Sequence, residues 1–246
     1  MPSGTRPRPM RVLHYWSGCT FRARYPESVE DHVDLLEMLG YEVKRFGEEG
    51  CCGYPLILAG EKGAAKTVAE ETSRKIGGAG LIVTECPGCY RVFREEYPKM
   101  GFRTPETRHL SQILSEHAGS FGKFEKETVS YHDPCDLGRL GGDYDSPRKV
   151  LRDFAEIVEP AATKERANCC GAGGLMLIVA PELSIRIAEA KIENEFEPIG
   201  TRKLITACPS CLFNLSVAAS RREGPGGGIQ VLDLASYVLG RLKGNG

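Results

Sequence analysis

Ten cysteines constrain this chain more than any other feature, because they form one five-part pattern that occurs twice. The two sets are Cys19, Cys51, Cys52, Cys86 and Cys89, and then Cys135, Cys169, Cys170, Cys208 and Cys211. In each set a single cysteine is followed by Cys-Cys-Gly and then by Cys-Pro-x-Cys, with gaps of 31 and 33 residues in the first set and 33 and 37 in the second. No cysteine is left over. Since thiolates are soft ligands, the pattern predicts two metal clusters.

The composition allows an ordinary folded protein and argues against several classes. The chain has 246 residues, of which 41% are hydrophobic and 26% are charged, and a chain of this length buries about 70% of its surface without crosslinks. A net charge of −1 argues against a protein that binds nucleic acid or anionic membranes. No apolar run approaches the ~18 residues of a membrane span.

The N-terminal residues 1–10 carry arginines but no apolar segment, so they do not resemble a secretory signal. We expect them to form a disordered leader, and we expect a cytoplasmic location. In that compartment thiols stay reduced, which argues against a disulfide framework.

The predicted strands and helices repeat together with the cysteines. Each half begins with an apolar strand and a cysteine loop, and an amphipathic helix and a second strand lead to Cys-Cys-Gly. Another helix and a third strand lead to Cys-Pro-x-Cys and a helix, and a last strand precedes a helix capped by Ser111 or Asp233. The expected strands are 12–16, 42–46 and 81–84, and then 129–132, 156–159 and 203–206; the expected helices are 28–39, 61–76 and 90–97, and then 146 onward, 181–196 and 212–220.

This βαβαβαβα order in each half predicts the fold class. We expect an α/β protein of two similar Rossmann-like halves, each a mostly parallel sheet flanked by helices, related by a pseudo-twofold repeat. The polar stretch 120–126 divides the chain into a first cysteine-rich repeat over 11–122 and a second over 123–246. The glycine-rich stretch 224–228 is expected to be a turn within the second half.

Every cysteine group directly follows a predicted strand, or lies in the loop after one. In open α/β sheets, ligands bind beyond the carboxyl ends of the strands. Three strand ends would therefore bring the five thiols of one half to the same edge of its sheet.

The number of thiols separates the possible metal groups. Structural zinc takes four ligands in a closed tetrahedron, and a cubane [4Fe–4S] cluster also needs four cysteines. Adjacent cysteines such as Cys51 and Cys52 chelate a single ion poorly, because their side chains tend to diverge. Iron–sulfur is therefore favoured over zinc. The fifth thiol is then either a bridging ligand of a non-cubane cluster or a spare reactive thiol.

The residues around the cysteines are also distinctive. They include the motifs Cys51-Cys52-Gly53, Cys86-Pro87-Gly88-Cys89, His132-Asp133-Pro134-Cys135, Asn168-Cys169-Cys170-Gly171-Ala172-Gly173-Gly174 and Cys208-Pro209-Ser210-Cys211. With these motifs the chain resembles the duplicated cysteine-rich CCG-domain family. Heterodisulfide reductase carries this domain in its B subunit and in the C-terminal part of its D subunit.

The resemblance implies two [4Fe–4S] clusters of the non-cubane type, each bound by all five cysteines of one set. It also implies an activity, in which the disulfide of coenzyme M and coenzyme B lies between the clusters and is cleaved homolytically, each cluster taking one thiyl sulfur. The chain is thus expected to be the iron–sulfur subunit of a heterodisulfide reductase complex and an enzyme that reduces disulfides. The alternative is a non-catalytic electron-transfer subunit of an anaerobic dehydrogenase complex of the lactate, glycerol-3-phosphate or fumarate-reductase type.

The resemblance also suggests partners. Relatives of the D-subunit type carry an N-terminal ferredoxin-like region with two cubane clusters, whereas this chain has no cysteine before Cys19. Electrons are therefore expected from a separate ferredoxin-like iron–sulfur protein, similar to the C subunit of heterodisulfide reductase, and from a flavin- or quinone-linked subunit. The substrate is expected to be a small-molecule disulfide, with no nucleic acid and no direct membrane span.

Two further residues are candidates for catalysis. His132 and Asp133 precede Cys135 and could carry protons to a product thiolate, since histidine titrates near neutral pH. The alternative is a turn stabilised by Asp133 and Pro134. Arg22, Arg24 and Arg139 follow the first cysteine of each half and either neutralise an anionic group or face solvent.

Overall fold

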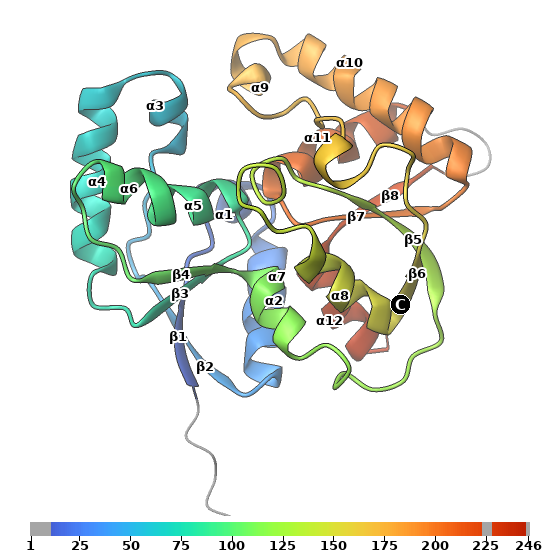
Figure 1. Ribbon diagram of the computed structural model, residues 1–246, viewed down its shortest axis with the longest axis horizontal. Coiled ribbons are helices and arrows are strands. Elements are labelled where there is room, and N and C mark those ends of the chain that lie inside the picture. Colours follow the sequence, from blue (N-terminus) through green and yellow to red (C-terminus); the bar gives the residue numbers. More distant parts are fainter. Residues whose placement is uncertain (1–10, 223–227, 245–246) are drawn as a thin grey trace, which may run out of the picture.

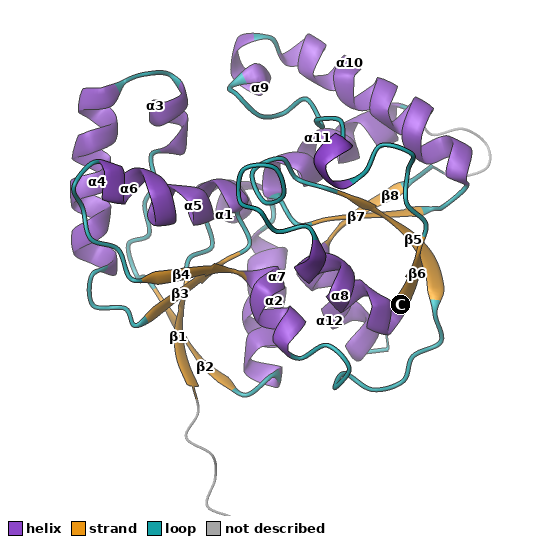
Figure 2. Ribbon diagram, in the orientation of Figure 1, coloured by secondary structure: helices purple, strands orange, loops and turns teal. Residues whose placement is uncertain are grey.

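The computed structural model describes residues 11–222 and 228–244, and these form two parallel sheets flanked by helices (Figures 1 and 2). The strand orders are β2-β1-β3-β4 and β6-β5-β7-β8, with parallel pairing throughout. Two similar α/β halves are therefore confirmed. The expected leader and the expected turn at 224–228, except for Gly228, lie outside the described residues.

The first half is arranged around its central strands β1 and β3. Its elements are β1 (Arg11–Tyr15), α1 (Cys19–Arg24), α2 (Pro26–Met38), β2 (Tyr41–Arg45), α3 (Tyr54–Leu58), α4 (Lys62–Ile76), β3 (Leu81–Thr84), α5 (Pro87–Arg91), a π-helical turn (Val92–Glu96), α6 (Tyr97–Lys99), β4 (Glu106–His109) and α7 (Leu110–Glu116). The chain moves outward from β1 to β2 and then crosses back past β1 to β3. The carboxyl ends of β1 and β3 therefore mark the point where the winding reverses, which is where such sheets bind ligands.

The second half repeats this arrangement around β5 and β7. Its elements are β5 (Glu127–His132), α8 (Asp145–Phe154), β6 (Ala155–Ile157), a 3₁₀ turn (Lys164–Arg166), α9 (Met176–Val179), α10 (Pro181–Lys191), a π-helical turn (Ile192–Phe196), a second 3₁₀ turn (Glu197–Ile199), β7 (Lys203–Thr206), α11 (Pro209–Arg221), β8 (Gln230–Asp233) and α12 (Leu234–Leu242). Strands β3 and β7 occupy the residues predicted for them. Among residues 11–222 and 228–244, none of the helices has the length and apolar character needed to cross a bilayer.

Two local predictions were wrong. Ser111 does not cap α7; the N-cap is His109, whose Nδ1 accepts a hydrogen bond from Ser111 N at 3.3 Å while its own N–H donates to Gln112 Oε1 at 3.1 Å. This reciprocal pair is a capping box with histidine in place of serine. Cys19 also does not lie in a loop but begins α1, because Gly18 adopts a φ of 78° and turns the chain directly from β1 into the helix.

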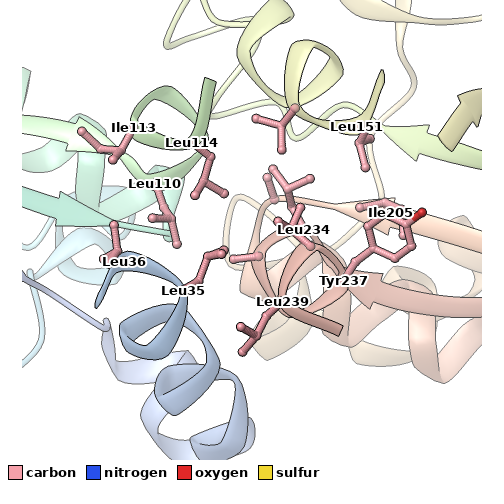
Figure 3. Packing of buried hydrophobic residues seen from close by; sticks show 14 of the residues in the cluster. Leu35, Leu36, Leu110, Ile113, Leu114, Leu151, Ile205, Leu234, Tyr237 and Leu239 are labelled. Atoms are coloured by element: carbon pink, nitrogen blue, oxygen red, sulfur yellow. The ribbon is translucent and has the colours of Figure 1, made fainter. Parts of the chain in front are cut away.

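A layer of four helices lies between the two sheets and joins the halves (Figure 1). Helix α2 packs against α12, and α7 packs against α8. Figure 3 shows apolar residues of this layer together with Ile205 of β7, against which it packs; those of the layer include Leu35, Leu36, Leu110, Ile113, Leu114, Leu151, Leu234, Tyr237 and Leu239. Because these residues come from both halves, the main core is shared between them. Each fully buried leucine contributes about 1.5–3 kcal/mol to the free energy of folding.

A buried polar contact also crosses the same boundary. Tyr15 Oη contacts Nδ1 of His32, and His32 Nε2 lies 2.7 Å from Asp233 Oδ2. Asp233 in turn accepts hydrogen bonds from Ala235 N and Ser236 N at 3.1 and 3.0 Å, which confirms it as the cap of α12. A histidine of the first half thus holds a helix cap of the second.

The opposite face of each sheet is covered by a smaller apolar cluster that contains cysteines. In the first half Cys52 and Cys89 pack with Trp16 and Phe93, and in the second half Cys170 and Cys211 pack with other apolar residues. The thiols therefore lie where each outer cluster meets the carboxyl edge of its sheet.

We predict that His109 makes stability depend on pH. Burial lowers the pKa of His109 to about 4, whereas the unfolded chain has the ordinary value near 6.5. Because the unfolded state then binds more protons between these values, the free energy of unfolding falls as pH drops through 6.5 toward 4. His109→Asn keeps a capping side chain and removes this titration. Urea unfolding at pH 7.5 and 5.5 should show the wild-type protein losing about 1 kcal/mol more than the variant; equal losses would contradict the prediction.

Candidate metal centres

The first set of thiols forms a continuous chain of contacts at the carboxyl edge of its sheet. Cys19 Sγ lies 3.7 Å from Cys51 Sγ, and Cys52 Sγ lies 3.2 Å from Cys89 Sγ. Cys51 lowers the pKa of Cys52, and Cys52 followed by Cys86 raises the pKa of Cys89, so these thiols are near neighbours. Three separate strand ends thus deliver five sulfurs to one place.

The second set reproduces this chain in the same order. Cys169 raises the pKa of Cys135, while Cys135 followed by Cys170 lowers the pKa of Cys169. Cys170 Sγ lies 3.2 Å from Cys211 Sγ, and Cys170 followed by Cys208 raises the pKa of Cys211. The structure therefore brings together all five members of each predicted set, while their role as ligands stays a prediction.

Each site contains thiols of different exposure, from buried to accessible. Cys52, Cys89, Cys170 and Cys211 are buried at the back of their sites, whereas Cys169 is exposed. In the first site Cys19, Cys51 and Cys86 are half-buried. Each site thus has a protected floor and an edge that a reacting molecule or a partner protein can reach.

The thiols of each site differ in pKa. A hydrogen bond from Cys51, followed by one from Cys89, lowers the pKa of Cys52 to about 6. The hydrogen bond to Cys51 raises the pKa of Cys19, and the hydrogen bond to Cys169 does the same to Cys135. The network thus favours a thiolate at some positions. Thiolate is the form that binds metal.

The donor set fits a metal–sulfur group. All ten cysteines lie in the described residues and none forms a disulfide. Five soft donors per site exceed the four that a tetrahedral ion accepts. The backbone amides of Gly53 and Gly171 donate to Cys51 Sγ and Cys169 Sγ at 3.4 and 3.3 Å, which stabilises negative charge on sulfur.

The Cys-Pro-Gly-Cys motif of the first site is shaped by its neighbour Tyr54. A Cβ on Gly88 would lie 2.7 Å from Tyr54 Cδ1, so only glycine leaves room for this ring. The second half has Ser210 and Ala172 at the corresponding motif positions. The second half thus has a larger residue after proline and a smaller residue after Cys-Cys-Gly than the first half has.

Cross-half contacts tie the two sites together. Tyr54 Oη donates to Asp136 Oδ1 at 2.7 Å, and Arg91 Nη1 donates to the same oxygen at 2.9 Å. Tyr54 and Arg91 adjoin cysteines of the first set, whereas Asp136 follows Cys135. Side chains thus link the Cys-Cys-Gly and Cys-Pro-x-Cys segments of the first half to the first cysteine of the second, and the two sites adjoin across the boundary.

The three arginines considered from the sequence have separate contacts. Arg22 pairs with Glu49, which also accepts from Gly18 N at 2.7 Å, so this pair holds the loop before Cys19. Arg24 lies over the ring of Phe213 at 4.0 Å and links α1 to α11 across the boundary. Arg139 donates to the carbonyl oxygen of Ala167 at 2.6 Å.

The two candidate catalytic residues lie in different surroundings. Asp133 accepts bonds from Arg148 Nη1 and Nη2 at 2.6 and 2.8 Å and from Lys164 N at 2.8 Å, so its carboxylate anchors the loop before Cys135. His132 is buried, and one of its ring nitrogens and the sulfurs of Cys170 and Cys211 all lie within 4.8 Å of one another. Burial lowers the pKa of His132 to about 3, so its imidazole is neutral.

Glu85 is a buried acid that the sequence analysis did not consider. It is fully buried, and neither carboxyl oxygen has a hydrogen-bond partner among the described residues. Burial raises its pKa well above the usual range, and the nearby Asp233, Cys208 and Cys86 raise it further. The available signal was its position immediately before Cys86, where the other half has Ala207.

Comparison with known proteins identifies the family. The CCG cysteine-rich domain matches residues 13–94 and again residues 129–216. A fold of two parallel α/β halves, each carrying five thiols at its carboxyl edge, is thus that of a duplicated cysteine-rich domain protein. The chain belongs to the CCG cysteine-rich domain family.

Two relatives and one solved structure show the range of similarity. The chain is 34% identical to the D subunit of the dihydromethanophenazine:CoB–CoM heterodisulfide reductase of Methanosarcina acetivorans, over 82% of this chain and 52% of that protein. It is 28% identical to lactate utilization protein A 1 of Bacillus mycoides, over 84% of this chain and 89% of that protein. A hypothetical protein from Helicobacter pylori shares the fold, with a TM-score of 0.56, 11% identity, and coverage of 96% of this chain and 49% of that one. The chain spans about half the length of the heterodisulfide reductase relatives.

We predict that Gly88→Ser destabilises the protein and that Tyr54→Ala relieves much of the loss. The serine Cβ would overlap the Tyr54 ring, and overpacking of this kind costs about 1–3 kcal/mol. Urea unfolding of both single variants and the double variant gives the coupling between them. Gly63→Ser in α4 is the control, because a Cβ there meets nothing within 4 Å. A Gly88→Ser loss no larger than that control would contradict the prediction.

Proposed function

We propose that the chain is the iron–sulfur subunit of a disulfide reductase of the heterodisulfide type. The observation that carries the proposal is the presence of two complete five-thiol sites that adjoin across the boundary between the halves. Two like sites on either side of one boundary suit a symmetric substrate bond, since each sulfur of a disulfide would face one site. The similarity to the D subunit of the Methanosarcina acetivorans heterodisulfide reductase supports this assignment.

Each site is proposed to hold one [4Fe–4S] cluster of the non-cubane type. In the first site Cys19, Cys51, Cys52, Cys86 and Cys89 would be the ligands; in the second they would be Cys135, Cys169, Cys170, Cys208 and Cys211. Iron–sulfur clusters, when bound, supply electrons one at a time. Because five donors exceed the four of a cubane, the adjacent pairs are the positions at which a bridging ligand is expected.

The protein's own residues would then position the substrate and limit water. The floor thiols Cys52 and Cys170 are buried, so the reacting edge lies toward Cys51 and Cys169. The exposed Arg24 lies over Phe213 at the boundary. We propose that it attracts the anionic end of a small-molecule disulfide. Electrons would come from a ferredoxin-like iron–sulfur subunit and a flavin- or quinone-linked subunit.

A second candidate is a non-catalytic electron-transfer subunit of an anaerobic dehydrogenase complex. The observation that favours it is the extent of similarity, because the match covers 89% of lactate utilization protein A 1 but 52% of the heterodisulfide reductase relative. In that role the same two sites would pass electrons between partner subunits and would bind no disulfide.

Metal analysis tests the cofactor, and spectroscopy separates the two candidates. Protein purified without oxygen should contain about eight iron and eight sulfide per chain. The oxidised protein should give an electron paramagnetic resonance signal that depends on added coenzyme M, and it should turn over the mixed disulfide when supplied with an electron donor. Cubane-like spectra without disulfide turnover would replace the reductase proposal by electron transfer, and zinc without iron would contradict both.

Removing one floor thiol should affect one site. Cys52→Ser and Cys170→Ser are each expected to lose about half of the iron or to change the spectrum of half of it, because each removes one of five ligands. The unchanged set in each variant is the internal control. Full iron content with an unaltered spectrum in either variant would contradict the role of the fifth thiol.

A further inference from the structure

The two sites have matching thiols but different side chains at one position in their walls. In the sheets Tyr15 pairs with Val83, and Tyr131 pairs with Ile205. Since Val83 and Ile205 are each three residues before the first cysteine of Cys-Pro-x-Cys, the residues that follow Tyr15 and Tyr131 occupy equivalent places. These residues are Trp16 in the first half and His132 in the second.

In the first site this position is part of an aromatic wall. Trp16 is fully buried, and its indole packs edge-on to Phe46 and Phe93, with ring centres 5.6 and 5.1 Å apart. It shares an apolar cluster with Cys52 and Cys89. Its Nε1 has no hydrogen-bond partner among the described residues. An indole offers one N–H donor and no lone pair for a metal or a proton.

In the second site the same position carries an imidazole. His132 is 2% exposed, and neither of its ring nitrogens has a hydrogen-bond partner in the described part of the chain. One nitrogen and the sulfurs of Cys170 and Cys211 lie within 4.8 Å of one another. The nearby cation Lys191 forms an ion pair with Glu195 at 2.5 Å and gives no hydrogen bond to the imidazole. Buried polar groups are almost always satisfied, so an imidazole without a partner beside two thiols points to a missing acceptor.

We propose that His132 donates a hydrogen bond from its ring N–H to the metal–sulfur group of the second site and thereby tunes that site separately from the first. The inference rests on the proposed function only in requiring a metal–sulfur group at these cysteines. Hydrogen bonds to sulfur stabilise the more negative, reduced form of a cluster and raise its reduction potential. His132 is thus a tuning contact of the second site, where the first site has the indole of Trp16, and electrons delivered to the protein meet two different acceptors.

The variant that tests this removes the donor. His132→Phe keeps a buried aromatic ring but has no N–H, whereas a tryptophan there would still offer one. Because the five cysteines are unchanged, this variant is expected to keep the iron and sulfide content of the wild-type protein. The midpoint potential of the second site should shift to a more negative value, with the first site unchanged. His117→Asn is the matched control, because His117 contacts Tyr41 at the far end of α7 and belongs to neither site.

Isotope labelling provides a readout that does not depend on activity or on the variant folding. In the reduced, paramagnetic protein, pulsed electron paramagnetic resonance should detect a nitrogen coupling that changes when histidine is labelled with ¹⁵N. That coupling should persist in His117→Asn and in Cys52→Ser, where the second site is intact, and should be lost in His132→Phe.

Three outcomes would overturn the inference. A fully loaded protein without a histidine nitrogen coupling would overturn it and leave the proposed function intact, as would a His132→Phe variant whose second-site potential is unchanged. A protein without iron would overturn the inference and the proposed function together, which the metal analysis reveals first.

Discussion

The four-helix layer between the sheets is the constraint on which the rest of the structure depends. Because α2 packs on α12 and α7 packs on α8, each half covers one face of its sheet with the help of the other half. Figure 1 shows these helices between the two sheets. The shared core sets the distance between the two carboxyl edges, and the contacts among Tyr54, Arg91 and Asp136 then close the boundary at the level of the thiols. Neither site could keep its position relative to the other if the halves were joined only by a linker.

Within this repeated frame, the two halves differ in correlated ways. Gly88 and Tyr54 in one half correspond to Ser210 and Ala172 in the other. A small residue in one motif is thus accompanied by a large residue in the neighbouring motif, and the reverse holds in the other half. A buried carboxyl group at Glu85 has no counterpart, since Ala207 stands in its place. Duplication supplied two equal sets of thiols, and the residues around them have made the two sites chemically distinct.

Much of the architecture could be predicted from the sequence, because its signals are local. Short apolar segments that run into Cys-Pro-x-Cys gave β3 and β7 their predicted bounds, and an aspartate at the end of a strand gave Asp233 its role as a cap. The cap at His109 was missed because histidine is an uncommon N-cap. Serine is a common one, so Ser111 was expected in that role, but Gln112 completes the capping box with His109. Cys19 was placed in a loop because a six-residue helix has too little periodicity to be recognised.

What the sequence by itself determined is the duplicated α/β order, the ten soft donors and their division into two sets of five, since spacing and residue type are properties of the chain. What only the tertiary structure decided is the surroundings of those donors. Asp133 was equal to His132 as a candidate in the sequence, yet folding brings the guanidinium of Arg148 to its carboxylate and leaves the imidazole of His132 without a partner among the described residues, beside Cys170 and Cys211. The physical reason is that hydrogen bonding and burial depend on residues far apart in the chain, which meet only when the two sheets pack on their common layer of helices.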